Sequence, residues 1–484
     1  MTTQKPLHAV VFTLSLQGHV IPSIHLAIKL ASKGFTITFV NTKVNHRDIT
    51  KSLCRKTSQN DVVDIFAAAR EAGLDIRYRT VSDGFPISFD RKLNNEQYLE
   101  GHVHVFPAHV DELVRDLVDS ADPPLTCLVA DSFFGWQSAI AKKYNLVYVS
   151  FWTEPALVFS LFYHLDLLQI NGHYASHDNR EDTIEYIPGI KAIEPKDLVS
   201  FLQDTDFSTS MHRLISMTSK EMKSADFILC NTVHELEFEP ILAIQEQRPM
   251  YAIGPLFPSG LSNSKTLVPT SLKPEFDCTQ WLNTKPQGSV LYVSFGSFIP
   301  CEKEKIDEIA HGLLLSKINF IWVLRGDAVS YEEPYVLPSG FEDEIKDRAL
   351  IVTWTNQIDV ISHSAIGGFL THCGWNSTLE SIWYGVPMLC FPLKADQLTI
   401  RKLLVDDWRI GVNLCDKKPL TRFEVAEKVN VLMSTKLDDK LRKEMIKLRQ
   451  ISKNALAENG SSERNLCQFV SDLKNKIIEK IYSF

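Results

Sequence analysis

Short apolar runs alternate with longer amphipathic segments along the chain. Residues 8–15 (HAVVFTLS) are mostly apolar, and from residue 20 to residue 31 apolar residues recur at helical spacing until Gly34. A second apolar run follows at residues 36–42 (TITFVNT). This order of periodicities predicts a strand, a helix and a second strand, the unit from which parallel sheets are built.

The strand pattern recurs in both halves of the chain, with a break between them. In the first half it returns at residues 126–131, 145–151 and 226–232. Residues 256–276 lose the periodicity and gather Pro, Ser, Gly and Asn, which is typical of a linker, and the alternation of strands and helices then resumes. We therefore predict an α/β protein with two Rossmann-like parallel-sheet domains that face each other across a cleft.

Domain boundaries follow from these breaks. We predict a first domain at residues 1–255, a linker at 256–276 and a second domain at 277–460. The final segment, residues 461–484, has one apolar face, so we expect a helix that packs back on the first domain rather than a loose tail. That face contains Leu466, Phe469, Val470, Leu473, Ile477, Ile478 and Ile481.

Composition and net charge indicate which class of binding partner to expect. The 484 residues are 44% hydrophobic and 23% charged, which is typical of a soluble globular protein with a sizeable core. The formal net charge of -8, without a concentrated stripe of Lys and Arg, predicts that the protein binds neither nucleic acid nor an anionic membrane. A small-molecule ligand is expected instead.

Export and membrane insertion are not indicated. The N-terminus lacks the long apolar core and cleavage site of a signal peptide, and the most apolar region, residues 144–163, is interrupted by Glu154 and Pro155. The nine cysteines are an odd number and show no C-x-x-C spacing, which favours a reduced, cytoplasmic protein over a disulfide framework. We also expect a monomer.

The densest polar cluster is FLTHCGWNSTLE, residues 369–380. It lies in the predicted turn from a strand into a helix that begins at Ser377, at the sheet edge where parallel α/β proteins bind ligands, so its backbone N–H groups could hold a phosphate. A second explanation needs no ligand, because Ser377 and Glu380 match an S-x-x-E capping box. Metal or thiol chemistry is disfavoured, because His372 and Cys373 are neighbours whose side chains point to opposite faces of a strand.

A second candidate site lies where the first predicted strand meets the first helix. There the helix N-terminus disfavours a charged imidazole, so His19 should stay neutral and able to accept a proton. Asp131 ends another predicted strand, and if the two strand ends are neighbours its carboxylate could fix the tautomer of His19. Two alternatives remain open. His19 could be only a loop residue, and Asp131 could cap the following helix.

Residues 354–397 carry the most specific pattern in the chain. The segment WTNQIDVISHSAIGGFLTHCGWNSTLESIWYGVPMLCFPLKADQ resembles the signature box of plant family 1 UDP-glycosyltransferases in length, order and nearly every defining position. The similarity extends to QGHVIP, FWTEPA and YVSFGS elsewhere in the chain. One departure is Asn356, where the family usually has Pro, and we expect it to affect the turn after Trp354 rather than the chemistry.

The resemblance implies two Rossmann-like domains of the GT-B type, with a UDP-sugar held mainly by the second domain. It also implies that His19 acts as a general base with Asp131 as its partner. Position by position, it places the uracil on Trp354, the nucleoside beside Gln357 and the ribose hydroxyls on Glu380, and Thr355 belongs to the same donor-binding set. The residues implied for the diphosphate are Ser297, His372, Asn376 and Ser377, and those implied for the sugar are Thr153, Trp375, Asp396 and Gln397.

The implied reaction is the inverting transfer of glucose from UDP-glucose to a hydroxyl or carboxyl group of a small lipophilic acceptor, such as a phenolic, flavonoid or terpenoid. The products are a β-glucoside and UDP. Within the family, Trp375 together with Gln397 usually accompanies UDP-glucose. No cofactor or metal is expected, because no DxD motif lies near the site. The candidate apolar walls of the acceptor pocket, chosen for their place near predicted strand ends, are Phe85, Phe134, Trp152 and Phe159.

Two rival functions and a metal site receive less support. An NAD-dependent oxidoreductase is disfavoured, because the first turn, LSLQGHV, lacks G-x-G-x-x-G. A non-catalytic nucleotide-sugar or small-molecule binding protein of the same fold is disfavoured by the presence of His19 and Asp131. The histidines of residues 101–109 and 171–177 have ligand-like spacing, but no Cys or carboxylate set completes a site, so structural or solvated roles are expected.

Overall fold

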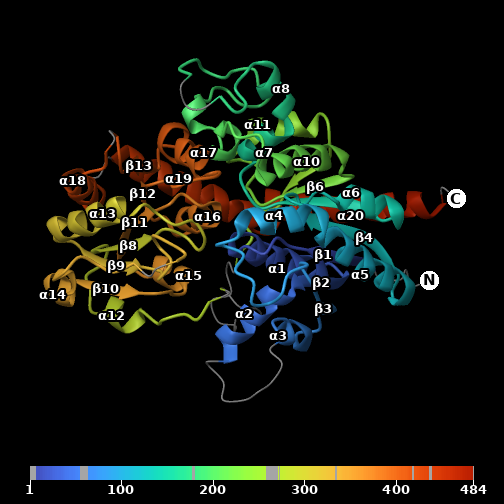
Figure 1. The fold of residues 1–484 in the computed structure, drawn as a ribbon, viewed down its shortest axis with the longest axis horizontal. Helices are drawn as coiled ribbons and strands as arrows, with labels where there is room; N and C mark the ends of the chain where they lie inside the picture. The colour runs from blue at the N-terminus through green and yellow to red at the C-terminus, as the bar shows by residue number, and fades with distance from the viewer. Residues whose placement is uncertain are drawn as a thin grey trace. The chain divides into compact units, whose positions relative to one another are not determined.

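The computed structural model describes residues 7–54, 64–176, 180–257, 271, 273–332, 335–416, 419–434 and 439–482. The chain divides into two units, each built on one parallel sheet (Figure 1). Unit 1 contains Met1–Pro195, Gln203–Lys273 and Asn454–Phe484, and unit 2 contains Lys196–Leu202 and Pro274–Lys453. The predicted α/β class with two parallel-sheet domains is confirmed.

The division into units does not follow one break in the chain. Lys196–Leu202 lies within the predicted first domain, yet it packs in unit 2. Most of the predicted linker, residues 258–270 and 272, lies outside the described residues. The linker therefore stays a prediction, while the excursion of Lys196–Leu202 is a feature that no hydrophobic pattern indicates.

Unit 1 is built on a parallel sheet with strand order β3-β2-β1-β4-β5-β6-β7. Strands β1 and β2 are buried at every position, as expected for a parallel sheet covered on both faces. The strands are β1 (His8–Phe12), β2 (Thr36–Thr42), β3 (Ile76–Val81), β4 (Leu125–Asp131), β5 (Val147–Trp152), β6 (Phe227–Cys230) and β7 (Met250–Ala252). The helices are α1 (Gln17–Ser32), α2 (Lys43–Cys54), α3 (Ala67–Glu71), α4 (Asn95–His104), α5 (Phe106–Ser120), α6 (Gln137–Lys143), α7 (Ala156–Tyr163), α8 (Leu165–Ile170), α10 (Ser210–Ser224), α11 (Phe238–Gln245) and α20 (Ser461–Tyr482).

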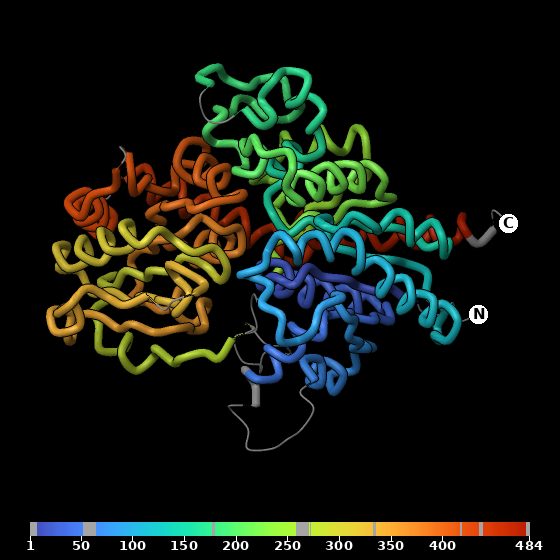
Figure 2. Tube along the Cα trace, in the orientation of Figure 1, coloured from blue at the N-terminus to red at the C-terminus, as the bar shows by residue number. Residues whose placement is uncertain are grey.

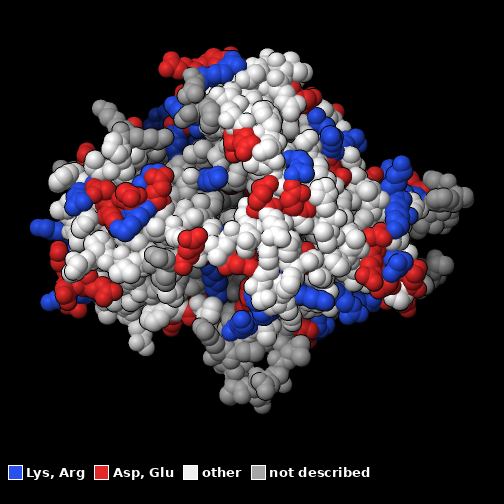
Figure 3. All heavy atoms as spheres, in the orientation of Figure 1, with Lys and Arg blue, Asp and Glu red and all other residues white. Residues whose placement is uncertain are grey.

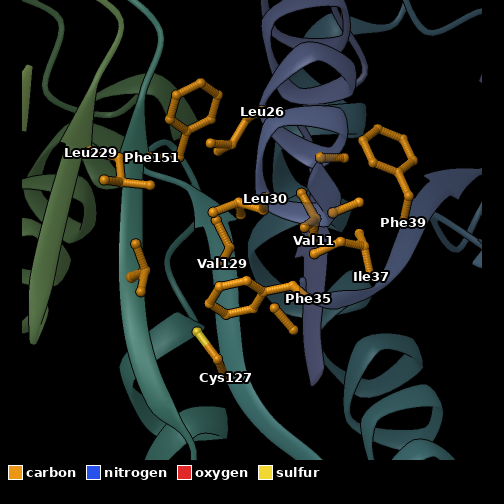
Figure 4. Packing of buried hydrophobic residues seen from close by; sticks show 14 of the residues in the cluster. Val11, Leu26, Leu30, Phe35, Ile37, Phe39, Cys127, Val129, Phe151 and Leu229 are labelled. Atoms are coloured by element: carbon orange, nitrogen blue, oxygen red, sulfur yellow. The ribbon is translucent and has the colours of Figure 1, made fainter. Parts of the chain in front are cut away.

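The core of unit 1 joins residues from distant parts of the chain. Val11 of β1 and Val129 of β4 pack in one cluster with Leu30 of α1 (Figure 4). Phe469 of α20 belongs to the same cluster and lies edge-on to Phe227 of β6, with ring centroids 5.8 Å apart. The last helix, the red segment in Figure 2, therefore contributes to the core of the sheet that the first residues begin.

Unit 2 is built on a second parallel sheet, with strand order β10-β9-β8-β11-β12-β13. Its strands are β8 (Val290–Ser294), β9 (Asn319–Val323), β10 (Ala349–Val352), β11 (Ile366–Thr371), β12 (Met388–Cys390) and β13 (Gly411–Asn413). Its helices are α12 (Thr279–Asn283), α13 (Lys303–Ser316), α14 (Phe341–Ile345), α15 (Gln357–Ser362), α16 (Trp375–Tyr384), α17 (Gln397–Lys402), α18 (Arg422–Met433) and α19 (Asp439–Leu456). The short helical turns are η2 (Pro195–Asp197), η3 (Lys346–Arg348) and η4 (Leu403–Asp407), and α9 (Ser200–Gln203) begins in unit 2.

Each sheet reverses its winding direction at one place. In unit 1 the strand order runs outward from β1 to β3 on one side and from β4 to β7 on the other, so the reversal lies between β1 and β4. In unit 2 the reversal lies between β8 and β11. Open parallel sheets bind ligands at the carboxyl ends of the strands beside such a reversal. These two strand pairs are therefore where binding sites are expected.

Charged side chains are mixed on the surface. On the face drawn in Figure 3, Lys and Arg side chains are interspersed with Asp and Glu side chains rather than gathered in one basic field. This face therefore offers no large attraction for a polyanion. None of the helices in the described part of the chain combines the length and the apolar character that a bilayer span requires.

Candidate active site

The carboxyl ends of β1 and β4 bring His19 and Asp131 together. The two strands pair in parallel, with Phe12 opposite Ala130, so the residues that follow them emerge at one edge of the sheet. His19 lies in the first turn of α1, and Asp131 is the last residue of β4. Nδ1 of His19 is 2.7 Å from Oδ2 of Asp131. The structure thus places in direct contact two residues that the sequence separates by more than a hundred positions.

The contact orients the imidazole of His19. Asp131 is 1% exposed and its second oxygen, Oδ1, accepts the backbone N–H of Phe133 at 3.1 Å, so the carboxylate is held in place. A carboxylate can only accept, so Nδ1 of His19 carries the proton and the lone pair lies on Nε2. With 9% of its surface exposed, His19 is largely shielded from solvent. This tautomer suits an imidazole that accepts a proton at Nε2.

Thr153 is a third member of this group. It follows β5, the neighbour of β4, and its Oγ1 lies 3.0 Å from Nδ1 of His19. Because Nδ1 donates, the hydroxyl oxygen of Thr153 shares the same N–H with Asp131. The family resemblance assigns Thr153 to the sugar, whereas the structure places its hydroxyl on the imidazole. No periodicity in the sequence could indicate this contact, because it depends on the order of three strands.

In unit 2, the ends of β8 and β11 surround His372. Thr371 is opposite Ser294, so the turn that contains Gly296 and Ser297 lies next to the turn that contains His372. A Cβ placed on Gly296 would lie 2.5 Å from Nε2 of His372, and one on Gly374 would lie 2.4 Å from it. Both distances are far below van der Waals contact. The imidazole therefore occupies space that only two glycines can leave open.

His372 is neutral in this setting. Burial, and secondarily the positive charge of Arg325, lower the pKa of His372 to about 4. At neutral pH the ring therefore offers a neutral N–H rather than a charge. It lies just before α16, whose first turn contains the half-buried Asn376. Neutral donors at a helix N-terminus suit an anionic ligand, because the helix dipole adds to the attraction.

Gln357 links two residues of α16. Its Nε2 donates to Oγ of Ser377 at 2.9 Å and to Oε2 of Glu380 at 2.7 Å. The hydroxyl of Tyr292 donates to its Oε1 at 3.3 Å. Ser377 and Glu380 are three residues apart on a helix, so they share the face that meets Gln357.

The capping-box explanation for Ser377 and Glu380 is wrong. Helix α16 begins at Trp375, two residues before the predicted start, and its N-cap is Gly374, which has no side chain to cap with. Ser377 is therefore the third residue of the helix and Glu380 lies beyond the first turn. Their S-x-x-E spacing places both on one helix face and does not mark the helix start.

Glu380 has a shifted protonation equilibrium. Burial raises the pKa of Glu380 to about 7, and the hydrogen bond from Gln357 offsets only part of this effect. The carboxyl group is therefore a mixture of ionised and neutral forms near neutral pH. An ionised carboxylate accepts two hydroxyl donors, whereas the neutral form accepts fewer, so the site's capacity for a diol depends on pH.

Residues 354 and 355 are held by the start of unit 2. The carbonyl of Trp354 accepts the backbone N–H of Phe276 at 2.9 Å, and the hydroxyl of Thr355 donates to the carbonyl of Phe276 at 2.8 Å. The hydroxyl of Thr355 is thereby engaged within the protein, while the indole of Trp354 is half-buried. An indole ring is a flat apolar surface of the kind on which a planar ligand can stack.

Asn356 caps helix α15. Its φ of -69° and ψ of 103° are extended, and its side chain accepts the backbone N–H of Asp359 at 3.3 Å. The φ value is one that Pro also adopts, so Asn and Pro are both compatible with this backbone. Asn adds the N-terminal cap that Pro lacks. At this departure from the family pattern the structure thus shows a cap at the start of α15, and the expectation that the chemistry is unaffected stays a prediction.

The residues assigned to the sugar are placed differently from one another. Trp375 is 4% exposed, and its ring centroid lies 6.2 Å from that of Trp408, so much of the indole is used in packing. Gln397 is buried, and its Oε1 accepts the backbone N–H groups of Leu393 at 2.9 Å and Lys394 at 3.2 Å. Asp396 is half-buried. Gln397 therefore also holds the loop that carries it.

Three of the four predicted acceptor-pocket residues lie inside unit 1. Phe134, Trp152 and Phe159 are at most 1% exposed, and each packs against another aromatic ring, Phe134 against Trp136 and Trp152 against Phe159. A side chain with no exposed surface cannot contact a ligand, so the structure places these three as packing residues. Phe85 is half-buried and stacks on Phe89, with ring centroids 4.4 Å apart. Nearness to a strand end indicates the edge of the sheet but does not determine whether a side chain faces outward.

The histidine groups with ligand-like spacing have protein partners. The ring of His102 packs against the rings of Phe106 and Phe134, with centroids 5.1 Å from each. Nε2 of His173 lies 3.0 Å from Asp182, and its Nδ1 lies 2.8 Å from the hydroxyl of Tyr186. His177 lies outside the described residues. Within the described part of the chain, no group of three or more His, Cys, Asp and Glu side chains is arranged to hold a metal ion.

Comparison with known proteins gives the family. A family model described as UDP-glucoronosyl and UDP-glucosyl transferase matches residues 269–455. The chain is 54% identical to UDP-glycosyltransferase 86A1 of Arabidopsis thaliana, over 99% of this chain and 96% of that relative. The chain belongs to the plant UDP-glycosyltransferase family. It is therefore a glycosyltransferase that uses a UDP-sugar.

Two further proteins resemble this glycosyltransferase along its length. It is 34% identical to (R)-mandelonitrile beta-glucosyltransferase of Prunus dulcis, over 97% of this chain and 97% of that relative. Among solved structures, Phytolacca americana UGT2 complexed with UDP-2fluoro-glucose and pterostilbene has a TM-score of 0.76 at 27% identity, over 97% of this chain and all of that chain. The two parallel-sheet units are thus those of a GT-B glycosyltransferase.

The cap formed by Asn356 makes a prediction about the stability of α15. Replacing Asn356 with Ala removes the acceptor for the Asp359 N–H and should cost about 1 kcal/mol at the helix start. Hydrogen exchange of the α15 amides, followed by mass spectrometry, should therefore become roughly fivefold faster. The control is Asn356→Asp, which keeps the cap and should retain the native exchange rate. Unchanged exchange in Asn356→Ala would contradict the capping role.

Proposed function

We propose that this glycosyltransferase transfers glucose from UDP-glucose, with inversion, to a hydroxyl or carboxyl group of a small lipophilic acceptor such as a phenolic, flavonoid or terpenoid. The products are a β-glucoside and UDP. The observation that carries the proposal is the buried contact between His19 and Asp131, which supplies the base that such an acceptor needs. The UDP-2fluoro-glucose in the complex of Phytolacca americana UGT2 supports the choice of a glucose donor.

In the proposed mechanism, Nε2 of His19 removes the proton from the acceptor hydroxyl. The oxygen attacks the anomeric carbon of glucose, the bond from that carbon to the phosphate oxygen breaks, and UDP leaves with the electron pair. Asp131 stabilises the imidazolium that forms, because its carboxylate accepts the Nδ1–H. The hydroxyl of Thr153 accepts from the same N–H, so it helps to hold the ring in one orientation.

The donor is proposed to bind along the carboxyl edge of the second sheet. Trp354 would stack on uracil, and ionised Glu380 would accept the ribose hydroxyls beside Gln357. The diphosphate would bind at the N-terminus of α16, with donors from Ser297, His372, Asn376 and Ser377. Neutral donors and a helix dipole can balance the phosphate charge, so we propose a reaction without a metal.

The cellular setting is part of the same proposal. We propose a monomeric, cytoplasmic enzyme. The eight cysteines whose side chains are described, seven of them buried or half-buried, form no disulfide, which supports a reducing compartment.

The function is tested by incubating the purified protein with UDP-glucose, UDP-galactose or UDP-glucuronate and a panel of phenolic and terpenoid acceptors. We expect UDP release and a product heavier than the acceptor by one glucose residue, with UDP-glucose the best donor. The proton coupling constant at the anomeric carbon should identify a β-glycoside. Added EDTA should leave the rate unchanged. Tight UDP binding without turnover on any acceptor would favour the binding-protein alternative.

The His19 role predicts a large kinetic effect without a structural one. Replacing His19 with Ala should lower kcat by roughly a hundredfold to ten-thousandfold, because general-base catalysis contributes about that much. The variant should stay folded, with a somewhat lower melting temperature because Asp131 loses a partner, and its affinity for UDP should stay as in the wild type. His104→Ala, which removes an exposed imidazole from α4, is the matched control and should retain full activity. Substantial activity in His19→Ala would remove this residue from the mechanism.

The raised pKa of Glu380 predicts that nucleoside binding depends on pH. The carboxyl group is mostly neutral below pH 7 and mostly ionised above it, and the ionised form accepts both ribose hydroxyls. Uridine, which carries no phosphate of its own to titrate, should therefore bind up to roughly tenfold more weakly at pH 6 than at pH 8. Titration calorimetry measures this ratio. Glu380→Gln should bind uridine with little pH dependence, and a flat profile in the wild type would refute the assignment.

A further inference from the structure

Residues 196–202, which we call the clasp segment, lie against the loop that carries Asp396 and Gln397. The segment precedes β6 in the chain, yet it belongs to unit 2. The backbone N–H of Ser200 donates to the carbonyl of Ala395 at 3.0 Å. In return, the backbone N–H of Ala395 donates to Oγ of Ser200 at 2.8 Å. Both backbone polar groups of Ala395 are therefore bound by one residue of the clasp segment.

The backbone of Ala395 needs this support. Its φ is 64°, in the left-handed region that residues other than glycine and asparagine rarely adopt. Such a conformation persists only where surrounding contacts determine it. Asp396 and Gln397 follow directly, so the conformation of Ala395 sets the direction in which the chain enters α17. A change at residue 395 would therefore move both of the residues assigned to the sugar.

The clasp segment also bonds to side chains of α17. The carbonyl of Asp197 accepts the hydroxyl of Thr399 at 2.7 Å. The carboxylate of Asp197, which is buried, forms an ion pair with Arg401, and Arg401 also pairs with Asp406 at 3.1 Å. The clasp segment thus holds the chain two residues before Gln397, and again two and four residues after it. Contacts on both sides of a residue restrict its position more than a contact on one side.

We propose that the clasp segment, through Ser200 and Asp197, positions Asp396 and Gln397 for recognition of the sugar part of the donor. The inference rests on the proposed function, because it takes these two residues to contact the sugar. Ser200 and Asp197 are positioning residues and need no contact with the substrate. The uridine end of the donor, assigned to Trp354 and Glu380, lies on other strand ends and should be insensitive to the clasp.

The proposal can be tested by comparing the binding of UDP-glucose, which carries the sugar, with the binding of UDP, which lacks it. Replacing Ser200 with Ala removes the hydroxyl that accepts the Ala395 N–H, and the KM and dissociation constant for UDP-glucose should rise roughly fivefold. The dissociation constant for UDP, measured by calorimetry, should change less than twofold. The preference for UDP-glucose over UDP-galactose should fall, because a less fixed loop discriminates less between hydroxyl orientations.

Two further variants control the experiment. Ser200→Thr keeps a hydroxyl and should restore most of the affinity for UDP-glucose. Ser434→Ala removes a serine that donates to the carbonyl of Val431 at 3.0 Å elsewhere in unit 2, and it should change neither ligand's affinity. If Ser200→Ala does not fold, Asp197→Asn, which is isosteric and keeps the carbonyl bonded to Thr399, provides the same comparison.

The outcomes separate this inference from the proposed function. An equal loss of affinity for UDP and UDP-glucose, or no loss for either, would overturn the positioning role. A wild-type protein that binds UDP but neither binds nor turns over UDP-glucose would instead refute the proposed function. Selective weakening of UDP-glucose in Ser200→Ala, reversed in Ser200→Thr, would support the clasp as a determinant of sugar recognition.

Discussion

Parallel pairing of β1 with β4, and of β8 with β11, is the constraint on which both candidate sites depend. Parallel strands end at the same edge of a sheet, so residues far apart in the chain meet there as a consequence of the pairing. His19 and Asp131 meet at one such edge, and Gly296 and His372 meet at the other. Each site thus begins at the edge of a buried sheet, and a fixed support of this kind helps to hold reacting groups in one geometry.

At each of the two sheet edges, polar side chains form hydrogen bonds with other side chains of the same site. Gln357 bonds to Ser377 and Glu380, and Asp131 bonds to His19. A ligand that binds near Gln357 therefore exchanges protein hydrogen bonds for ligand hydrogen bonds, and only the difference contributes to affinity. For the proposed general base, His19, the hydrogen bond within the protein is useful, because the bond to Asp131 selects the tautomer that accepts a proton at Nε2. Hydrogen bonds within the protein thus lower the net gain from ligand binding near Gln357, whereas at His19 they favour proton transfer.

Local patterns predicted more of the fold than of the site. The alternation of apolar and amphipathic segments located both sheets, because burial of a parallel strand on two faces leaves a continuous apolar run. The S-x-x-E spacing of Ser377 and Glu380 led to a wrong prediction of a capping box, because the same spacing arises at a helix cap and along a helix face. Phe134 and Trp152 were placed at the sheet edge but face the interior, because exposure depends on which helix packs over a strand end. Asn356 could be recognised as a departure, while its role as a cap needed the start of α15.

The two α/β halves and the family could be predicted from the amino-acid sequence alone, because hydrophobic periodicity and a set of spaced motif residues are both found within short stretches of chain. The sequence also indicated His19 and Asp131 as strand-end residues. The fold was needed to show that their strands are neighbours, that Thr153 shares the Nδ1–H of His19, and that residues 196–202 hold Ala395. These contacts depend on strand order and on packing between distant segments, and local periodicity carries no information about either.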